Sequence, residues 1–164
     1  MKTLPMLLLF LLLTACVTIK TNHGVPNLAQ VEPGIWRGGQ PTAEGWQYLK
    51  SLGVRTSIKL NLVCEGSDDL AVSNGLRVVY LPISTVEQTI GKPKVDRLYK
   101  AVSCLTNNVF IHCTHGQDRT GLVVGAYRVR VCHWSKPAAY REMEQHGFHP
   151  LLRELYWSWE GDVP

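Results

Sequence analysis

Residues 109–121 read VFIHCTHGQDRTG, and this stretch decides how the chain folds. An apolar run of β type leads into a short polar loop, and the segment from Leu122 to Val131 follows with helical apolar spacing. The pattern predicts a strand that ends at Cys113, then a loop, then a helix. Amide N–H groups at a helix start face one point, with the positive end of the helix dipole behind them, so the loop forms an anion site that suits phosphate.

Cys113 and Arg119 give this loop its chemistry. The field at the helix start favours the thiolate form of Cys113, which is the nucleophilic form of cysteine. Arg119 lies six positions further on and can fold back over the same point, where its planar guanidinium binds two phosphate oxygens. The alternative is a buried structural cysteine beside a surface arginine, but the preceding strand and the following helix favour a catalytic cysteine.

The pattern His-Cys, five residues, Arg, Thr-Gly resembles the phosphate-binding loop of the cysteine-dependent protein tyrosine phosphatase superfamily, and the single-domain length resembles its dual-specificity branch. A second pattern, GIWRGGQP at 34–41 with GWQYLKSLGV at 45–54, resembles the N-terminal part of atypical dual-specificity phosphatases of bacteria, fungi and plants. The resemblance covers the chain from about Val31 onward. It implies that Cys113 attacks phosphorus in line, that water hydrolyses the cysteinyl-phosphate, and that no metal or cofactor is needed.

The resemblance also implies roles for the other residues of the loop. His112 and Gly121 would maintain the shape of the loop, and Thr120 would stabilise the thiolate when it becomes the leaving group. The alternative role for Thr120 is a hydroxyl that caps the helix start. The substrate phosphate would be bound by five residues: Thr114, His115, Gly116, Gln117 and Arg119.

A phosphatase of this kind also needs a general acid that protonates the leaving oxygen. Dual-specificity enzymes usually supply an aspartate from an upstream loop, but residues 84–88 read STVEQ where that loop is expected. Asp118 is the favoured candidate, because Asp-Arg-Thr resembles the loops of myotubularins, Sac-type phosphoinositide phosphatases and bacterial lipid-and-tyrosine phosphatases, whose loop aspartate has this role. Glu87 is the alternative acid, followed by Asp68 or Asp69. Asp118 could instead cap the helix start.

The residues around the loop favour a small phosphorylated substrate, because no aromatic residue that would stack on a phosphopeptide can be identified. Gln117 stands where many phosphoinositide-active relatives carry lysine, and His115 partly replaces that contact. Lys92 and Lys94 are expected to reach additional phosphates, or else to lie on a solvated helix face. The tyrosine-phosphatase-like phytases, which are exported bacterial enzymes, resemble this chain and favour inositol polyphosphates as substrates. The alternatives are a dual-specificity phosphatase for phosphotyrosine proteins, a phosphoinositide lipid phosphatase, and a phosphate-binding pseudophosphatase without turnover.

The N-terminus predicts export and lipid anchoring. Met1-Lys2 and the leucine-dominated run from Leu4 to Leu13 have the charged start and short apolar core of a secretory signal. Leu13-Thr14-Ala15-Cys16 resembles the lipobox of bacterial lipoproteins, in which the cysteine is lipidated and tethers the protein to a membrane. An ordinary signal peptide is the alternative. We expect three regions: a signal peptide at 1–15, a linker at 16–27 and a phosphatase domain at 28–164.

Composition bounds the remaining possibilities. A formal charge of +4 suits anionic substrates but is small for a nucleic-acid-binding protein. Besides Cys16 and Cys113 the chain has Cys64, Cys104 and Cys132, an odd number that argues against a full disulfide framework, and no CxxC pair suggests a zinc site. If the host has two membranes, the resemblance favours the outer one, facing the periplasm. The oligomeric state and the state of the three remaining thiols stay open.

Alternating β and helical segments predict the fold class. Strands followed by helices are typical of α/β folds with a mostly parallel central sheet flanked by helices, in which ligands bind at the carboxyl ends of the strands. The phosphate-binding loop between the last strand and the central helix lies at that edge. Besides the segments at 109–113 and 122–131, we expect strands at 35–38, 54–62 and 77–83, and helices at 43–52, 68–74, 92–105, 137–145 and 150–159.

Overall fold

A five-stranded sheet forms the centre of the molecule. The computed structural model describes residues 21–85 and 93–164. The strands are β3 Ala29–Glu32, β4 Ile35–Gly38, β5 Thr56–Lys59, β6 Arg77–Tyr80 and β7 Val109–His112, in the order β3-β4-β7-β5-β6. β4, β7, β5 and β6 are parallel, and β3 pairs with β4 in the antiparallel direction. The mostly parallel sheet predicted from the sequence is therefore confirmed.

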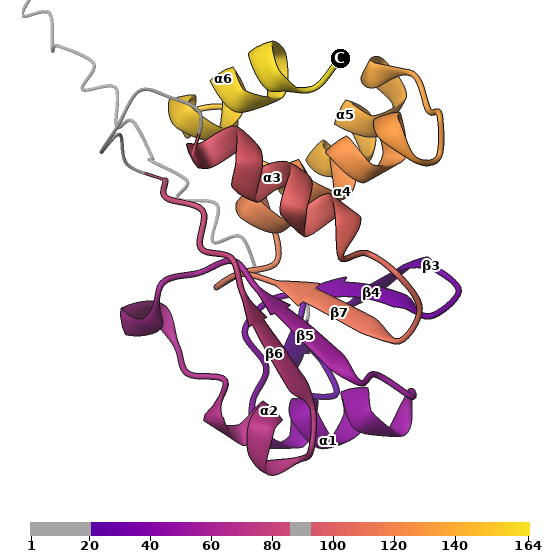
Figure 1. The fold of residues 1–164 in the computed structure, drawn as a ribbon, viewed down its shortest axis with the longest axis vertical. Helices are drawn as coiled ribbons and strands as arrows, with labels where there is room; N and C mark the ends of the chain where they lie inside the picture. Colours follow the sequence, from indigo (N-terminus) through magenta and orange to yellow (C-terminus); the bar gives the residue numbers. More distant parts are fainter. Residues whose placement is uncertain (1–20, 86–92) are drawn as a thin grey trace, which may run out of the picture.

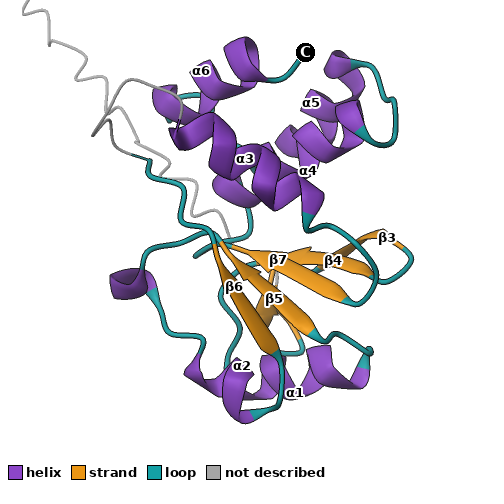
Figure 2. Cartoon of the chain, in the orientation of Figure 1, coloured by secondary structure: helices purple, strands orange, loops and turns teal. Residues whose placement is uncertain are grey.

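Helices cover both faces of this sheet (Figure 1). Figure 2 shows one group of helices against one face of the sheet and a second group against the other. The first group is α1 Ala43–Ser51 and α2 Asp69–Ser73; the second is α3 Pro93–Ser103, α4 Asp118–Arg130, α5 Lys136–Gln145 and α6 Arg153–Asp162. A short 3-10 helix, η1 Val63–Glu65, lies in the connection after β5. The flanked α/β architecture expected from the alternating segments is confirmed.

β7 is buried along its whole length. Phe110 packs with Trp46 and Leu49 on the face covered by α1, whereas Ile111 packs with Leu122 on the face covered by α4. Consecutive strand residues point to opposite faces, so a parallel strand covered on both sides is apolar without a break. This burial explains why residues 109–111 of the deciding stretch carry no polar side chain.

The register of β7 positions the loop that follows it. His112 pairs with Gly38 at the end of β4 and with Lys59 at the end of β5. Three parallel strands therefore end at the same level, and the chain after His112 emerges between two neighbouring strand ends. α4 begins at Asp118, four residues before the apolar helical pattern begins at Leu122, because the polar end of the loop already forms its first turn.

Residues 21–27 belong to the folded domain, which corrects the linker predicted for 16–27. They form a small hairpin of β1 Thr21–Asn22 and β2 Val25–Pro26. The side chain of Val25 is fully buried, and the Pro26 carbonyl accepts a hydrogen bond from the N–H of Gly39 at 2.6 Å. These contacts join segments that hydrophobic periodicity cannot connect. The predicted signal peptide and Cys16 lie outside the described residues, and within the described ranges no helix is long and apolar enough to cross a bilayer.

Candidate active site

The loop after β7 carries Cys113 and leads directly into α4. Cys113 is 3% exposed, and Arg119 is the second residue of α4. The predicted strand, loop and helix are therefore present, with the sulfur-bearing residue at the end of the central strand. The N-terminal end of α4 lies behind the loop, where its dipole favours a bound anion.

Two peptide groups of the loop are oriented by hydrogen bonds from outside it. The carbonyl of Gly116 accepts hydrogen bonds from Arg37 Nη2 at 2.9 Å and Asn27 Nδ2 at 3.2 Å. The carbonyl of Thr114 accepts one from the backbone N–H of Gln40 at 3.0 Å. In a trans peptide the N–H points away from the carbonyl of the same peptide group. The N–H groups of His115 and Gln117, which follow these two carbonyls, therefore face the concave side of the loop. This orientation suits a phosphate held by backbone N–H groups.

Close contact between two backbone segments explains why glycine occupies positions 116 and 39. Gly116 has a φ of +75°, and a Cβ there would lie 2.3 Å from the carbonyl carbon of Gly38. A Cβ on Gly39 would lie 2.9 Å from the carbonyl oxygen of Thr114. A larger residue at either position would push the loop away from the end of β4, because backbone atoms cannot yield as a flexible side chain does. The GIWRGGQP pattern at 34–41 and the loop pattern at 109–121, which both resemble the phosphatases, therefore pack directly against each other.

Arg37 supports the loop from below. Its side chain is 1% exposed, and burial lowers its pKa from 12.5 to about 10, a change that Glu142 and Cys113 partly oppose. Within the described part of the chain, its Nε and Nη1 have no hydrogen-bond partner. Arg37 is therefore a buried cation beneath the loop that donates to the Gly116 carbonyl. Arg37 was not among the residues predicted for the site, although it lies in the GIWRGGQP pattern.

Glu65 in η1 holds the guanidinium of Arg119. Arg119 Nη1 donates to Glu65 Oε2 and Nη2 to Oε1, each at 2.7 Å. Thr114 Oγ1 accepts a hydrogen bond from Arg119 Nη2 at 3.0 Å and donates to Glu65 Oε1 at 3.3 Å. A bidentate pair fixes the plane of the guanidinium as well as its position. Glu65 therefore determines how Arg119 faces the loop.

This pair changes the titration of both groups. The hydrogen bonds from Arg119 lower the pKa of Glu65 from 4.5 to about 2, against the opposing effect of burial. Burial lowers the pKa of Arg119, but Glu65 and Cys113 outweigh burial and raise it above its ordinary value. Both groups are therefore charged at neutral and mildly acidic pH. Glu65 was missed in the sequence, and its one signal is a carboxylate just beyond a parallel strand.

His112 joins the end of β7 to a buried polar cluster. Its Nε2 lies 3.0 Å from Asp68 Oδ2 and 3.1 Å from Ser57 Oγ. Asp68 Oδ1 accepts hydrogen bonds from Gln40 Nε2 at 3.0 Å and Lys59 Nζ at 3.3 Å. Burial raises the pKa of Asp68, but His112, Gln40 and Lys59 together lower it well below 3.8. Asp68 is thus an ionised, buried acceptor within this cluster.

Asp118 lies at the outer end of the loop, where it contacts a residue that the sequence did not indicate. Its Oδ1 accepts hydrogen bonds from the backbone N–H of His149 at 2.8 Å and from the ring Nδ1 of His149 at 3.0 Å. His149 lies between α5 and α6, far from the loop in sequence. The favoured acid candidate is therefore at the phosphate-binding loop, but its carboxylate is directed to an imidazole.

The remaining loop residues differ in exposure. His115 is exposed, whereas Gln117 is 8% exposed and packs so closely on Gly147 that a Cβ there would lie 2.6 Å from Gln117 Nε2. The side chain of Gln117 is therefore enclosed beside Gly147. Thr120 is fully buried, and its Oγ1 has no hydrogen-bond partner among the residues that the structure describes. Gly121 lies inside α4, where a Cβ would be 3.7 Å from Phe148.

Three predicted residues cannot be compared with the site. Glu87 and Lys92 lie outside the described residues. Lys94 belongs to α3, but its side chain is not described. Asp69 is exposed at the start of α2.

The described cysteines are all free thiols. Cys64 is exposed, Cys104 and Cys132 are half-buried, and Cys113 is buried. Disulfides among these four are absent, which leaves Cys113 available as a nucleophile.

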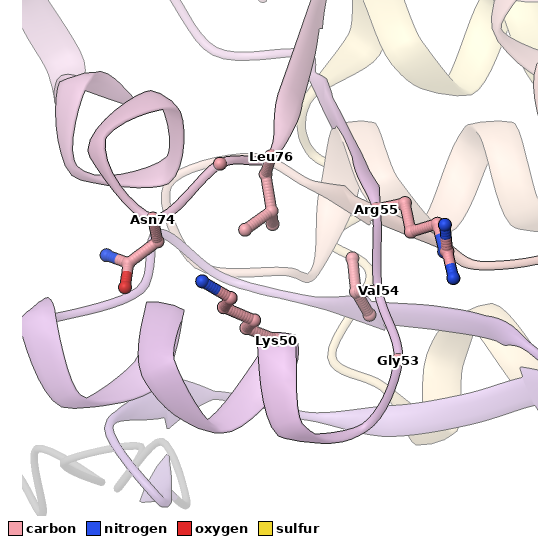
Figure 3. A pocket seen from close by; sticks show the side chains of 7 residues that line it. Lys50, Gly53, Val54, Arg55, Asn74 and Leu76 are labelled. Atoms are coloured by element: carbon pink, nitrogen blue, oxygen red, sulfur yellow. The ribbon is translucent and has the colours of Figure 1, made fainter.

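A separate hollow lies at the amino ends of β5 and β6. It is lined by Lys50, Gly53, Val54, Arg55, Asn74, Gly75 and Leu76 (Figure 3). Figure 3 shows the Lys50 side chain extending from α1 toward the end of α2 at Asn74. Cys113 follows the carboxyl end of β7, which runs parallel to β5. This hollow therefore lies at the opposite end of the strands from the phosphate-binding loop.

A parallel sheet whose central strand leads into a cysteine-bearing, anion-binding loop, with an arginine in the following helix turn, defines a cysteine-dependent phosphatase fold. The chain belongs to the dual-specificity phosphatase family. The family model described as "DSP-PTPase phosphatase fused to NAD+ Kinase" matches residues 15–156.

Two curated relatives are similar over most of the domain. The dual specificity protein phosphatase TpbA of Pseudomonas aeruginosa is 30% identical over 124 residues, which cover 74% of this chain and 55% of TpbA. Inositol diphosphatase DSP4 of Arabidopsis thaliana is 30% identical over 125 residues, which cover 73% of this chain and 63% of DSP4. The chain thus spans less than two thirds of the length of either relative.

Solved structures share the fold. The crystal structure of TpbA matches with a TM-score of 0.71 and 24% identity, over 87% of this chain and 88% of that chain. A second TpbA structure, in complex with pTyr, matches with a TM-score of 0.69 and 25% identity, over 82% and 83%. The catalytic domain of the PP-IP phosphatase SIW14 from S. cerevisiae matches with a TM-score of 0.66 and 21% identity, over 82% and 84%.

Proposed function

We propose that this protein hydrolyses phosphate esters of inositol polyphosphates through a cysteinyl-phosphate intermediate. The observation that carries the proposal is one loop that combines buried Cys113, a fixed Arg119 and two backbone amides on its concave side. The 30% identity to an inositol diphosphatase supports the substrate class. So does the acidic residue of the loop, Asp118, in the Asp-Arg-Thr pattern.

Each residue has a defined step in this mechanism. The Cys113 thiolate attacks phosphorus, the ester P–O bond breaks, and the leaving oxygen receives a proton at the Asp118 side of the loop. Arg119 and the inward amides stabilise the charge on the equatorial oxygens, which is the largest expected contribution to the rate. Water then attacks phosphorus and the P–S bond breaks. Thr120 is the proposed hydrogen-bond donor to the departing sulfur.

A panel of substrates tests the proposal. Inositol hexakisphosphate, a diphosphoinositol phosphate, a phosphotyrosine peptide and a phosphoinositide in vesicles are compared by kcat/KM. We expect the soluble inositol phosphates to be preferred by at least about tenfold, which corresponds to about 1.4 kcal/mol of transition-state binding. Preference for the peptide would replace this substrate class with phosphoproteins, a candidate that the similarity to TpbA supports.

Replacement of the nucleophile tests the intermediate. Cys113→Ser is expected to abolish turnover of every substrate while phosphate binding persists. Cys104→Ser, at a half-buried cysteine at the end of α3, is the matched control and should retain full activity. Binding without turnover by the parent protein would indicate a pseudophosphatase, and turnover by Cys113→Ser would exclude the cysteinyl-phosphate.

Lys92 and Lys94 are proposed to bind additional phosphates of the substrate. Their sequence position next to the start of α3 and their charge support this role. Replacing both with alanine should raise KM for inositol hexakisphosphate by about tenfold and leave KM for a simple aryl phosphate unchanged, because only the larger substrate carries further phosphates. Lys100→Ala, at an exposed lysine of the same helix, is the control.

Cys16 is proposed as the site of a lipid anchor that holds the domain at a bacterial membrane, facing the periplasm where there are two membranes. The lipobox-like sequence at residues 13–16 supports it. The parent protein should partition into detergent from host membranes, and Cys16→Ser should not. A mature parent protein in the aqueous phase would contradict the anchor.

A further inference from the structure

His149 forms a pair with Asp118 at the edge of the phosphate-binding loop. Asp118 Oδ1 accepts both the backbone N–H of His149, at 2.8 Å, and its ring Nδ1, at 3.0 Å. The side chain of Asp118 is 13% exposed, whereas that of His149 is 52% exposed. The pair therefore joins a sheltered carboxylate within the loop to an imidazole on the solvent side of it.

The segment that carries His149 is fixed to the loop by further contacts. Asn27 Nδ2 donates to the carbonyl of His146 at 2.9 Å and to the carbonyl of Gly116 at 3.2 Å, which bridges the two segments. Phe148 is 5% exposed and packs in the main core. His149 follows this buried anchor directly, so its backbone position depends on the same framework as the loop.

The carboxylate determines which ring nitrogen is available. An ionised carboxylate only accepts hydrogen bonds, so Nδ1 of His149 carries the hydrogen that faces Asp118. Nε2 is then the ring nitrogen that does not face Asp118, and it is the one that can exchange a proton with a substrate. A carboxylate that orients a histidine in this way is a common arrangement for proton transfer. Asp118 directs one oxygen, Oδ1, to both the backbone N–H and the ring Nδ1 of His149.

We propose that His149 is the proton donor of the phosphatase reaction and that Asp118 is the positioning residue that orients it. This proposal rests on the proposed function. The Asp-Arg-Thr pattern predicted Asp118 as the proton donor, and the proposal assigns that role to the imidazole of His149 instead. It also accounts for the absence of an aspartate at residues 84–88.

The proton balance closes over the two steps. In the first step the P–O bond to the leaving group breaks, and the leaving oxygen takes the proton from Nε2 of the His149 imidazolium. In the second step water attacks phosphorus, the P–S bond breaks, and the water proton passes to the neutral Nε2 while Cys113 leaves as a thiolate. Both forms of the ring keep the Nδ1 hydrogen bond to Asp118, so the orientation is maintained throughout.

Charged or titratable groups also lie on the elements that neighbour His149. α4 contributes Asp118 and Arg119, α5 ends next to His146, and α6 begins with Arg153 and Glu154. Asp118 Oδ1 lies 3.0 Å from Nδ1 of the imidazole.

The test separates orientation from proton transfer by the choice of variant. In His149→Asn the amide Nδ2 can still donate to Asp118, but no group replaces Nε2. Its kcat on an alkyl phosphate of inositol should fall by about 10²-fold or more, with a loss below about fivefold on p-nitrophenyl phosphate, whose leaving group needs no proton. The alkaline limb of the kcat profile on the alkyl substrate should disappear. His133→Asn, at an exposed histidine with a φ of 57°, is the control and should match the parent protein.

Asp118→Asn distinguishes the two proton donors. If His149 carries the proton, the alkaline limb should persist in this variant, while kcat on the alkyl substrate falls because the ring loses the carboxylate that orients it. Loss of the limb in Asp118→Asn together with a normal profile in His149→Asn would assign the proton to Asp118 and overturn the proposal. Equal losses on both substrates in His149→Asn would reduce His149 to a structural role. No turnover by the parent protein would overturn the proposed function itself.

Discussion

The carboxylate of Glu65 and the guanidinium of Arg119 meet in a bidentate pair with both N–O distances at 2.7 Å. Together with Thr114, Glu65 engages three of the five N–H donors of Arg119. Glu65 comes from the connection after β5, and Arg119 from α4. The Arg119 guanidinium that is expected to bind phosphate is therefore held in place by a residue from a distant part of the chain.

Removing the Glu65 carboxylate should weaken the binding of the transition state by Arg119. Glu65→Gln is expected to lower kcat/KM by about tenfold to a hundredfold, because Arg119 keeps its charge but loses its fixed plane. Glu144→Gln, at an exposed glutamate of α5, is the control and should leave steady-state kinetics unchanged. A rise in activity would show instead that Glu65 competes with the substrate for Arg119.

Activity should depend on the contact between the end of β4 and the phosphate-binding loop. Gly39→Ala places a Cβ 2.9 Å from the Thr114 carbonyl oxygen, so the loop must shift, and kcat/KM should fall by about a hundredfold. Gly161→Ala, where no atom lies within 4 Å of the new Cβ, should retain full activity. Equal activities of the two variants would mean that the loop tolerates displacement.

His146 should make stability depend on pH. Burial, reinforced by the nearby charge of Arg37, lowers its pKa from 6.5 to about 4 in the folded protein. Between these values the unfolded chain binds the proton and the folded chain does not, so Tm should fall as the pH drops from about 6.5 to about 4. His146→Gln removes this titration, and its Tm should fall less over the same range. A parallel decline in both proteins would assign the effect to other groups.

Arg128 should contribute strongly to stability because it is buried among carboxylates. It is 5% exposed, donates to Glu142 at 2.9 Å and to the carbonyl of Val31 at 2.9 Å, and contacts Glu32 at 2.5 Å. Arg128→Met should destabilise the protein by about 3 kcal/mol in chemical denaturation, since Glu142 is left without its partner. Glu32→Gln should cost less than about 1 kcal/mol, because Glu32 is 40% exposed and Arg128 keeps Glu142. Similar costs for the two variants would contradict this ranking.

The sequence predicted the parts of the protein that depend on local pattern. The apolar run at 109–111 and the helical spacing after Asp118 identify a buried strand and a helix, and the intervening loop follows from its polar residues and Gly116. The alternation of such segments gave the mostly parallel sheet. β3 and the hairpin at 21–26 were missed, since short segments whose hydrogen bonds go to distant residues leave little periodicity.

By itself, the sequence determined the position of Cys113 and Arg119 on one loop, because a strand, a tight turn and a helix start are local structures set by neighbouring residues. Only the tertiary structure decided what surrounds them: Glu65 on the arginine, Gly39 against the loop, Arg37 beneath it and His149 on Asp118. Each of these contacts joins residues at least 30 positions apart, as between Asp118 and His149. Their distance is set by strand order and helix packing, and no spacing in the sequence encodes it.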